Sequence, residues 1–348
     1  MAPVLQAAAY NAILVADMDS GKVIYSENAN HLNYPASLTK LMTLYMTFNA
    51  LEQGRLRKDQ NLIVSRTAAA SRPVKIGLPA GSKITVDNAI KAVAVYSAND
   101  MAVVLSENLK GDEGDFAEVM TRVAREIGMT NTNFSNVSGL PDDEQISTAK
   151  DVALLTIALK KHYPQYAHYF SIPFFSYNGK SFRNGNGLLA SYPGADGMKT
   201  GFTNKSGHSL VTTARRGDRR LVAVVLGANG RADREAISRS LLDFGFGKTP
   251  ELRIARAAKA APAKPAPVAS AQPGRDTTGS SGVQFGAFSS NSTAKRQQDK
   301  VRALFGLNTY LENHNGMIRV RARMSPAEAQ QIRGRCAASG VDCFVFRN

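Results

Sequence analysis

Short apolar runs lie near both ends of the first 250 residues, and apolar positions recur with helical spacing between them. Strands are predicted where short apolar runs are bounded by turn residues, at 12–16, 22–25, 209–214 and 220–226. Helices are predicted where apolar residues recur every three or four positions, at 37–53, 86–96, 100–109, 116–127, 152–162 and 234–244. Strands at both ends with helices between them predict an antiparallel sheet that carries an inserted helical lobe.

A change of composition divides the chain after residue 250. Residues 251–281 are rich in Ala, Pro, Gly and Ser and contain few large apolar side chains, which is typical of an extended linker. In the remaining part, strands are predicted at 283–288, 308–312, 317–322 and 341–346, and helices at 293–305 and 326–338. This β-α-β-β-α-β order is typical of a small ferredoxin-like domain that folds by itself. We therefore expect three parts: a large domain at 1–250, a linker at 251–281 and a small domain at 282–348.

The net charge of the 348-residue chain is +15, and it is densest in the C-terminal part. Residues 281–348 hold ten Lys and Arg against four Asp and Glu, which favours an anionic polymer or surface as partner, nucleic acid being one such class. Two cysteines exclude a disulfide-stapled miniprotein and a four-cysteine zinc site. The five histidines lack metal-ligand spacing, so we predict no metal and no cofactor.

Neither a membrane span nor a leader is indicated by the pattern. No apolar stretch approaches the ~18–20 residues that a transmembrane helix needs. Residues 1–9 lack the basic start and the long apolar run of a signal peptide. We therefore expect either a cytosolic protein or a sequence that begins after a cleavage site.

Ser37 and Lys40 form the first of three short motifs with chemical potential. They lie three positions apart at the start of a mostly apolar predicted helix, so their side chains share a face. The positive end of the helix dipole stabilises negative charge near Ser37. Apolar neighbours are expected to desolvate Lys40 and lower its pKa, as a general base requires. Ser-x-x-Lys occurs three times in the chain, so this spacing alone is not specific.

The other two motifs lie far downstream. Ser97 and Asn99 fall at the junction of two predicted helices, where they either point into a cleft or cap an ordinary turn. The run Lys199-Thr200-Gly201 offers a cation, a hydroxyl and a glycine that lets a ligand approach the backbone, or else forms a solvated loop. Taken singly, neither motif decides between these alternatives.

Taken in this order, the three motifs resemble the active-site motifs of penicillin-binding proteins and serine β-lactamases. The low-molecular-mass D-alanyl-D-alanine carboxypeptidases are most similar, on residues 35–43, 97–100, 136–141, 184–189 and 197–201, and the resemblance covers about 5–248. It implies an α+β penicillin-binding fold, in which about five antiparallel strands form a sheet with helices on both sides. It also implies covalent inhibition by β-lactams.

The resemblance implies acyl transfer from the end of a peptidoglycan stem pentapeptide. Ser37 would attack the carbonyl between the two terminal D-alanines, and Lys40 would take the serine proton. Ser97 and Lys199 would relay a proton to the leaving amine. The backbone N–H groups of Ser37 and Phe202 would form the oxyanion hole.

The same resemblance implies a set of substrate-binding residues. Asn99 would hold the amide of the peptide, and Lys199 and Thr200, with Gly201 beside them, would bind the terminal carboxylate. Arg234 either assists at that carboxylate or is a surface charge at the start of a helix. Both alternatives for Arg234 stay open from the sequence.

The C-terminal part resembles a SPOR domain over about 281–347, on the runs 283–288, 318–320 and 338–345. SPOR domains bind peptidoglycan glycan strands from which stem peptides have been removed, and a basic module suits such an anionic glycan. The resemblance implies that Gln284, Met317 and Arg319 contact sugar. An RNA-binding module is the alternative. Such modules stack bases on aromatic residues of their sheet, and we expect the sheet of this C-terminal part to lack that pattern, so we predict no nucleic acid. Cys336 and Cys343 form either a disulfide or two buried thiols.

Both halves of the chain thus imply the cell wall, and hence the periplasm as the compartment. Three alternatives to a carboxypeptidase stay open: a DD-endopeptidase, a β-lactamase-like hydrolase, and a non-enzymatic wall-binding septal protein. The loop acid with which class A β-lactamases hydrolyse their acyl-enzyme has no counterpart in the sequence, which favours a peptidase.

Overall fold

The structure is a computed structural model of the chain, and it describes residues 10–249, 281–288, 291–314, 317–338, 341 and 343–347. The chain divides into two compact units whose boundary, between Pro262 and Ala263, falls among residues that are not described. The expected linker 251–281 lies outside the described residues except for its last position. Each unit is therefore treated by itself.

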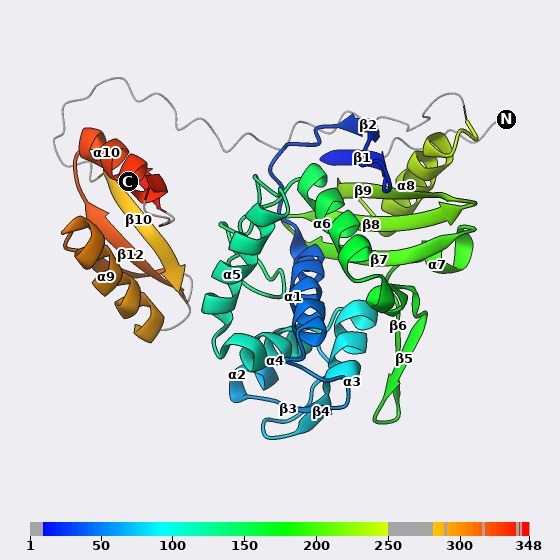
Figure 1. The fold of residues 1–348 in the computed structure, drawn as a ribbon, viewed down its shortest axis with the longest axis horizontal. Helices are drawn as coiled ribbons and strands as arrows, with labels where there is room; N and C mark the ends of the chain where they lie inside the picture. The colour runs from blue at the N-terminus through cyan, green and yellow to red at the C-terminus, as the bar shows by residue number, and fades with distance from the viewer. Residues whose placement is uncertain are drawn as a thin grey trace. The chain divides into compact units, whose positions relative to one another are not determined.

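An antiparallel sheet with the strand order β2-β1-β9-β8-β7 forms the centre of the first unit (Figure 1). The strands are β1 (Ala12–Asp17), β2 (Val23–Glu27), β7 (Ala195–Thr203), β8 (Gly207–Arg216) and β9 (Arg219–Ala228). The pairing of β1 with β9 joins the two ends of the domain at the middle of the sheet. The predicted antiparallel sheet is confirmed, and β7, which the hydrophobic pattern did not predict, lies at its edge.

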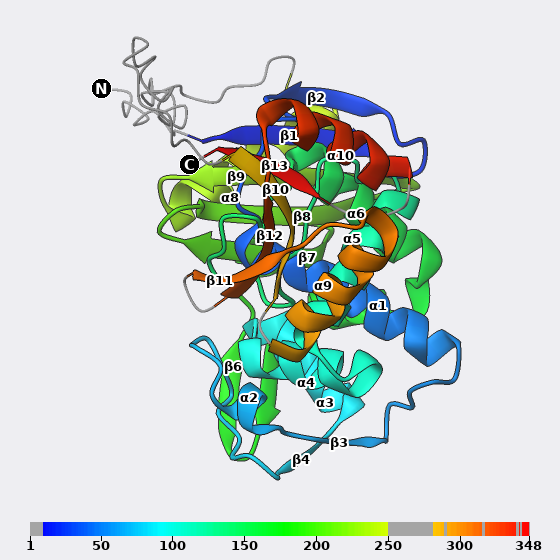
Figure 2. The same cartoon turned by 90° about the vertical axis from the view of Figure 1, so that its left-hand side faces the viewer.

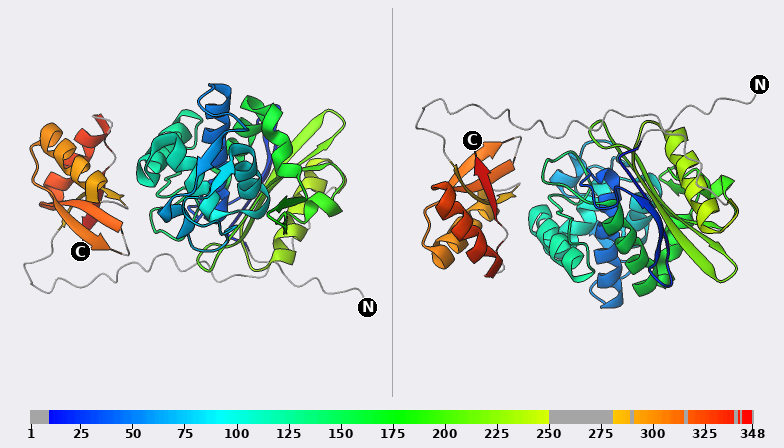
Figure 3. Two further views of the ribbon diagram at one scale, coloured as in Figure 1. Left: turned by 90° about the horizontal axis from the view of Figure 1, so that it is seen from below. Right: turned by 90° about the horizontal axis from the view of Figure 1, so that it is seen from above.

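Helices cover both faces of this sheet, as expected (Figure 3). On β1, Ile13 and Val15 belong to the core beneath α8 (Arg231–Gly245), whereas Leu14 belongs to the core beneath the helical lobe. Successive side chains of a strand point to opposite faces, so a sheet that is buried on both sides needs apolar residues at every position. The run Ala12–Ala16 supplies them.

The helical lobe is inserted between β2 and β7, and its predicted helices are present with different ends. Its elements are η1 (Ala36–Thr39), α1 (Lys40–Glu52), β3 (Asn61–Ile63), α2 (Arg66–Ala69), β4 (Lys83–Thr85), α3 (Val86–Lys91), η2 (Ala92–Tyr96), α4 (Asn99–Lys110), α5 (Glu113–Glu126), α6 (Ala149–His162), η3 (Pro164–Ser171), β5 (Phe174–Tyr177), β6 (Lys180–Arg183) and α7 (Leu188–Ser191). Two predictions were wrong in detail: helix 37–53 begins with a 3₁₀ turn, η1, and helix 86–96 ends in a π-helical turn, η2.

The second unit has the predicted β-α-β-β-α-β order. Its elements are β10 (Ser281–Phe288), α9 (Asn291–Phe305), β11 (Tyr310–His314), β12 (Met317–Arg323), α10 (Pro326–Ala338) and β13 (Phe344–Arg347). The strands pair in the order β11-β12-β10-β13 (Figure 2). Val283, Phe285 and Val320 point to one face, where they pack with Val301 of α9 and Ile332 of α10. The opposite face of the sheet carries the remaining side chains.

This opposite face corrects one expectation, because it does hold aromatic residues. Arg321 lies over the ring of Phe346 with its Cζ 4.3 Å from the centroid, and Arg323 lies 5.2 Å from the centroid of Tyr310. Phe344, two positions before Phe346 on β13, is 48% exposed. Because aromatic residues are present on this face, their expected absence cannot be used to exclude nucleic acid. The choice between glycan and nucleic acid depends on other observations.

The three residues expected to contact sugar differ in their surroundings. Gln284 is on the face away from the helices but is buried, and its Oε1 accepts a hydrogen bond from Arg321 Nε at 2.9 Å. Arg319 is on the same face of β12 and is partly exposed. Met317 begins β12, and its side chain is outside the described part of the chain. Only Arg319 thus combines the expected face with an accessible, described side chain.

Cys336 is buried in the core of the second unit and Cys343 packs against that core. The choice between a disulfide and two buried thiols stays a prediction. Among the described residues, no helix is both long and apolar enough to cross a membrane.

Candidate active site

Ser37 and Lys40 lie together at the junction of η1 and α1. Ser37 belongs to the 3₁₀ turn and is partly exposed, whereas Lys40 is the first residue of the α-helix and is fully buried. Lys40 Nζ is 3.0 Å from Ser37 Oγ, within hydrogen-bond distance. The partly exposed hydroxyl of Ser37 is therefore in contact with the amine of Lys40, which is shielded from water.

The surroundings of Lys40 favour its neutral form. Burial lowers the pKa of Lys40 well below its usual value, and the positive charge of Lys199 lowers it further. Lys40 Nζ also donates a hydrogen bond to the backbone carbonyl of Ser138. A neutral lysine amine that is held at a hydroxyl can accept the hydroxyl proton.

The Ser138 carbonyl is placed by the segment Asn136–Pro141, which packs directly against η1. Asn136 Oδ1 accepts the backbone N–H groups of Ser138 and Gly139, at 3.2 and 2.7 Å. Gly139 has a φ of +79°, and a Cβ built there would lie 1.8 Å from the carbonyl oxygen of Ala36. Only a glycine lets these two backbones approach so closely.

Strand β7 closes the other side of η1 and brings Lys199 to the site. A Cβ on Gly201 would lie 3.0 Å from Pro35 O and 3.3 Å from Ser37 N. The absence of a side chain at Gly201 therefore lets the backbone around Ser37 pack closely against β7. Lys199 is buried, and burial together with the charge of Arg234 lowers its pKa to about 7. The motif Lys199-Thr200-Gly201 is thus part of a strand and not a solvated loop.

Arg234 is buried behind this strand and is not a surface charge. Its Nη2 donates to the carbonyl of Gly185 at 3.0 Å, and a Cβ on Gly185 would lie 2.7 Å from Thr200 Oγ1. Arg234 Nε is buried without a hydrogen-bond partner among the described residues. Arg234 and Thr200 thus both border Gly185, and the charge of Arg234 acts on Lys199, which supports the alternative in which Arg234 serves the site.

Ser97 and Asn99 are at the break between η2 and α4. Ser97 has a left-handed backbone, with φ 71° and ψ 31°, and its Oγ is buried without a hydrogen-bond partner among the described residues. Asn99 begins α4, and its Nδ2 donates to Arg72 O at 2.9 Å. Strained backbone and an unpaired buried hydroxyl are costly, and they are typical of functional positions.

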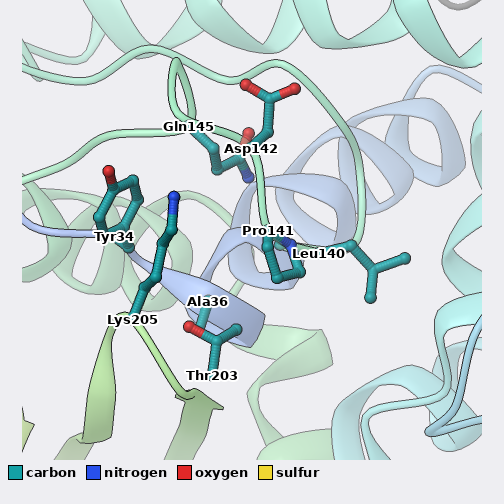
Figure 4. A pocket seen from close by; sticks show the side chains of 9 residues that line it. Tyr34, Ala36, Leu140, Pro141, Asp142, Gln145, Thr203 and Lys205 are labelled. Carbon is teal, nitrogen blue, oxygen red and sulfur yellow. The ribbon is translucent and has the colours of Figure 1, made fainter. Parts of the chain in front are cut away.

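A small pocket lies beside η1, between the segment after Gly139 and the end of β7 (Figure 4). It is lined by Tyr34, Ala36, Gly139, Leu140, Pro141, Asp142, Gln145, Thr203 and Lys205. Lys205 Nζ is 2.6 Å from Asp143 Oδ1 and 5.6 Å from the centroid of the Tyr34 ring, so an ion pair links the two walls at its rim.

The first and third sequence motifs therefore come together at η1, through Ser37, Lys40 and Gly201, and the SPOR residues belong to the other unit. The sequence does not mark Ser138 and Gly139 individually as parts of the site, although both lie in 136–141, one of the runs that resemble the carboxypeptidases. It also does not mark Phe202 as an exposed ring, 51% accessible and stacked on His208 with centroids 4.3 Å apart. Among the described residues, no cluster of His, Cys, Asp or Glu could hold a metal ion.

Comparison with known proteins decides the family. Residues 1–230 match the D-alanyl-D-alanine carboxypeptidase family Peptidase_S11. The chain belongs to this family. Residues 277–347 match the SPOR domain, so this member of the carboxypeptidase family carries a C-terminal SPOR domain.

Curated relatives agree with this assignment. D-alanyl-D-alanine carboxypeptidase DacF of Bacillus subtilis is 35% identical over 244 residues, which are 68% of this chain and 62% of DacF. D-alanyl-D-alanine carboxypeptidase DacC of Escherichia coli is 37% identical over 242 residues, 68% of this chain and 60% of DacC. The chain thus spans about three fifths of the length of these relatives.

Solved structures of the family share the fold of the first unit. Penicillin binding protein 5 from Haemophilus influenzae is 32% identical with a TM-score of 0.67, covering 70% of this chain and 72% of its own. Penicillin-Binding Protein D2 from Listeria monocytogenes, solved in an ampicillin-bound form, is 32% identical with a TM-score of 0.61, covering 68% and 97%. The expected penicillin-binding fold is confirmed.

Proposed function

We propose that this chain is a serine D-Ala-D-Ala carboxypeptidase that removes the terminal D-alanine from peptidoglycan stem pentapeptides through an acyl-enzyme on Ser37. One observation carries the proposal: Lys40 Nζ is fully buried, its pKa is well below its usual value, and it is 3.0 Å from Ser37 Oγ. A base must be deprotonated at the working pH and within reach of the proton it accepts.

Acylation then follows from this pair. Ser37 Oγ bonds to the carbonyl carbon of the penultimate D-alanine while its proton passes to Lys40 Nζ. The carbonyl oxygen becomes an oxyanion next to the backbone N–H groups of Ser37 and Phe202, and each such donor lowers the barrier by roughly 3 kcal/mol. The C–N bond breaks as the terminal D-alanine takes a proton, relayed from Lys40 through Ser97 and Lys199.

The order of residues along β7 gives the direction of the bound peptide. Thr200, with Lys199 and the nearby Arg234, would bind the terminal carboxylate, while Gly201 lies beside Ser37. The acyl part of the substrate therefore extends towards Thr203 and the pocket of Figure 4. Asn99, at the start of α4, would hold the peptide amide. This direction places the leaving D-alanine at the cationic end of the site.

Water then hydrolyses the ester and releases the shortened peptide. A penicillin carries a carboxylate and a reactive amide, so it would acylate Ser37 in the same way, and the ampicillin-bound Listeria relative supports this expectation. The DD-endopeptidase and β-lactamase-like alternatives differ in leaving group and in the rate of hydrolysis. The septal-scaffold alternative requires no working Lys40.

We infer for the other parts of the chain that the SPOR domain holds the enzyme on peptide-free glycan in the periplasm, with 251–281 as the connecting linker. The accessible arginines and aromatic rings on the helix-free face, among them Arg319, Arg323 and Phe344, support an anionic, ring-containing polymer. Nucleic acid fits the same features, and the cell-wall role proposed for the first unit favours glycan over nucleic acid.

The activity test compares wild type with Ser37→Ala, and with Ser176→Ala as a matched control on the exposed hairpin strand β5. Wild type and control should be labelled by a fluorescent penicillin and release D-alanine from a pentapeptide, and Ser37→Ala should do neither. Labelling that survives in Ser37→Ala refutes the proposal. Crosslinked dimers and penicillins assayed in parallel separate the enzymatic alternatives.

The glycan test uses the full chain with Ser37→Ala, so that the wall is not altered during the assay. Amidase-treated sacculi should pellet more of this protein than untreated sacculi, and nucleic acid added as a competitor should not displace it. Equal pelleting by both kinds of sacculi contradicts the role given to the SPOR domain.

A further inference from the structure

Glu113 is a partly buried acid that none of the sequence motifs contains. It is the first residue of α5, and its Oε1 accepts the backbone N–H of Val137 at 3.2 Å. Asp112 caps the same helix by accepting the N–H groups of Gly114 and Asp115, so Glu113 is not needed as the cap. Its carboxylate is therefore directed at the segment that borders the active site.

The segment held by Glu113 is also bound to α1, through two successive carbonyls. Val137 O accepts a hydrogen bond from Thr43 Oγ1 at 2.7 Å, and Ser138 O accepts one from Lys40 Nζ. Lys40 and Thr43 are three positions apart on α1 and share a face. Glu113 thus fixes from α5 the peptide unit that directly precedes the two units whose carbonyls bind Thr43 and Lys40.

We propose that Glu113 is a positioning residue for Lys40: by accepting the Val137 N–H, it holds the Ser138 carbonyl against Lys40 Nζ. The inference rests on the proposed function, because it assigns Glu113 a task only if Lys40 is the base. A base that drifts by roughly 1 Å can cost about 10²-fold in rate, so a residue that fixes the partner of the base affects catalysis without touching substrate.

The charge of Glu113 adds a second, separable effect. The charged groups that face Lys40 are Lys199 from β7, which lowers the pKa of Lys40, and Glu113 from α5 and Asp100 from α4, which raise it. Burial raises the pKa of Glu113, Glu107 and Asp112 raise it further, and the Val137 hydrogen bond and Lys40 lower it. Removing the negative charge of Glu113 should therefore make Lys40 easier to deprotonate.

The experiment measures the second-order rate constant for acylation by a fluorescent penicillin as a function of pH. Glu113→Gln keeps an acceptor oxygen for Val137 but removes the charge, whereas Glu113→Ala removes both. Glu126→Gln makes the same charge change at the exposed far end of α5, about 20 Å along the helix, and is the matched control. The fraction of each variant that is labelled at saturating penicillin gives the amount of folded protein, and each rate is calculated from that amount.

We expect Glu113→Gln to retain the plateau rate while the acidic limb of the profile moves to lower pH. Glu113→Ala should lose about tenfold or more at the plateau, equivalent to about 1.4 kcal/mol, and Glu126→Gln should match wild type. The proposal is overturned if Glu113→Ala keeps the wild-type plateau, or if Glu113→Gln loses as much as Glu113→Ala. Labelling of Ser37→Ala, by contrast, overturns the proposed function itself.

Discussion

The close approach of Gly139 to η1 gives the sharpest prediction for the catalytic unit. In Gly139→Ala the new Cβ would lie 1.8 Å from Ala36 O and 2.9 Å from Ser37 N, both of them backbone atoms. Real Cβ atoms do not come within 3.0 Å of such atoms, so one backbone must move by roughly 1 Å. Either Ser37 moves away from Lys40, or the Ser138 carbonyl does.

The expected loss follows from that displacement. A shift of roughly 1 Å in a reacting group can cost about 10²-fold in rate, and we expect a loss of this size in acylation. An alanine at positive φ adds roughly 1–2 kcal/mol of strain, and the clash adds roughly 1–3 kcal/mol of destabilisation. The free energy of unfolding should therefore fall as well, which makes a control for strain alone necessary.

Gly179→Ala is that control. Gly179 has a φ of +73°, close to the +79° of Gly139, but a Cβ there meets nothing within 4 Å. Both variants are titrated with a fluorescent penicillin to count folded protein, and then the acylation rate and the thermal unfolding midpoint are measured. Gly179→Ala should lose stability only. If Gly139→Ala acylates like Gly179→Ala, the argument from close packing is refuted.

Three further outcomes follow from the same geometry. Lys40→Arg should be inactive in acylation although it keeps a long cationic side chain, because a guanidinium cannot be deprotonated; penicillin labelling of this variant at a rate near wild type contradicts the role of Lys40 as base. Ser97→Ala should slow D-alanine release while the unfolding midpoint stays close to wild type, since Ser97 Oγ makes no hydrogen bond to the described residues; an unchanged rate counts against the proton relay. Lys199 carries its charge below its pKa of about 7 and loses it above, so KM for a D-Ala-D-Ala peptide should rise as pH increases through this region. Arg234→Gln removes a repelling charge and should move the rise in KM to higher pH. If the rise stays at the same pH in Arg234→Gln, Arg234 does not act on Lys199.

The sequence was sufficient for those features that depend on local pattern. The β1 run Ala12–Ala16 is apolar at every position, and helices such as α6 repeat their apolar residues regularly, so the sheet and most helices could be predicted. The strand β7 could not, because Gly197 and Gly201 interrupt any alternation. It is a strand because β8 pairs with it along its length and η1 packs against it.

Features that depend on contacts through space were out of reach of the sequence. Ser138 acts through a backbone carbonyl, which no side-chain pattern reveals. Gly139 matters because Ala36 approaches it, and these positions are 103 residues apart in the sequence. The burial of Gln284 depends on Arg321 from a neighbouring strand. In each case the chemistry of one residue is set by a partner that the fold supplies.

Lys40 and Lys199 are both buried and lie near enough for the charge of one to act on the other, and the proposed reaction needs them in opposite protonation states. Lys40 must be neutral to accept a proton, whereas Lys199 must be charged to bind a carboxylate. Burial disfavours the ammonium form of both, and the charge of Lys199 further lowers the pKa of Lys40. A substrate carboxylate beside Lys199 favours the ammonium form there, and the charge thus held on Lys199 keeps Lys40 from taking up a proton from solvent. Binding of the substrate's own anionic end therefore selects the pattern of protonation that the acylation step uses.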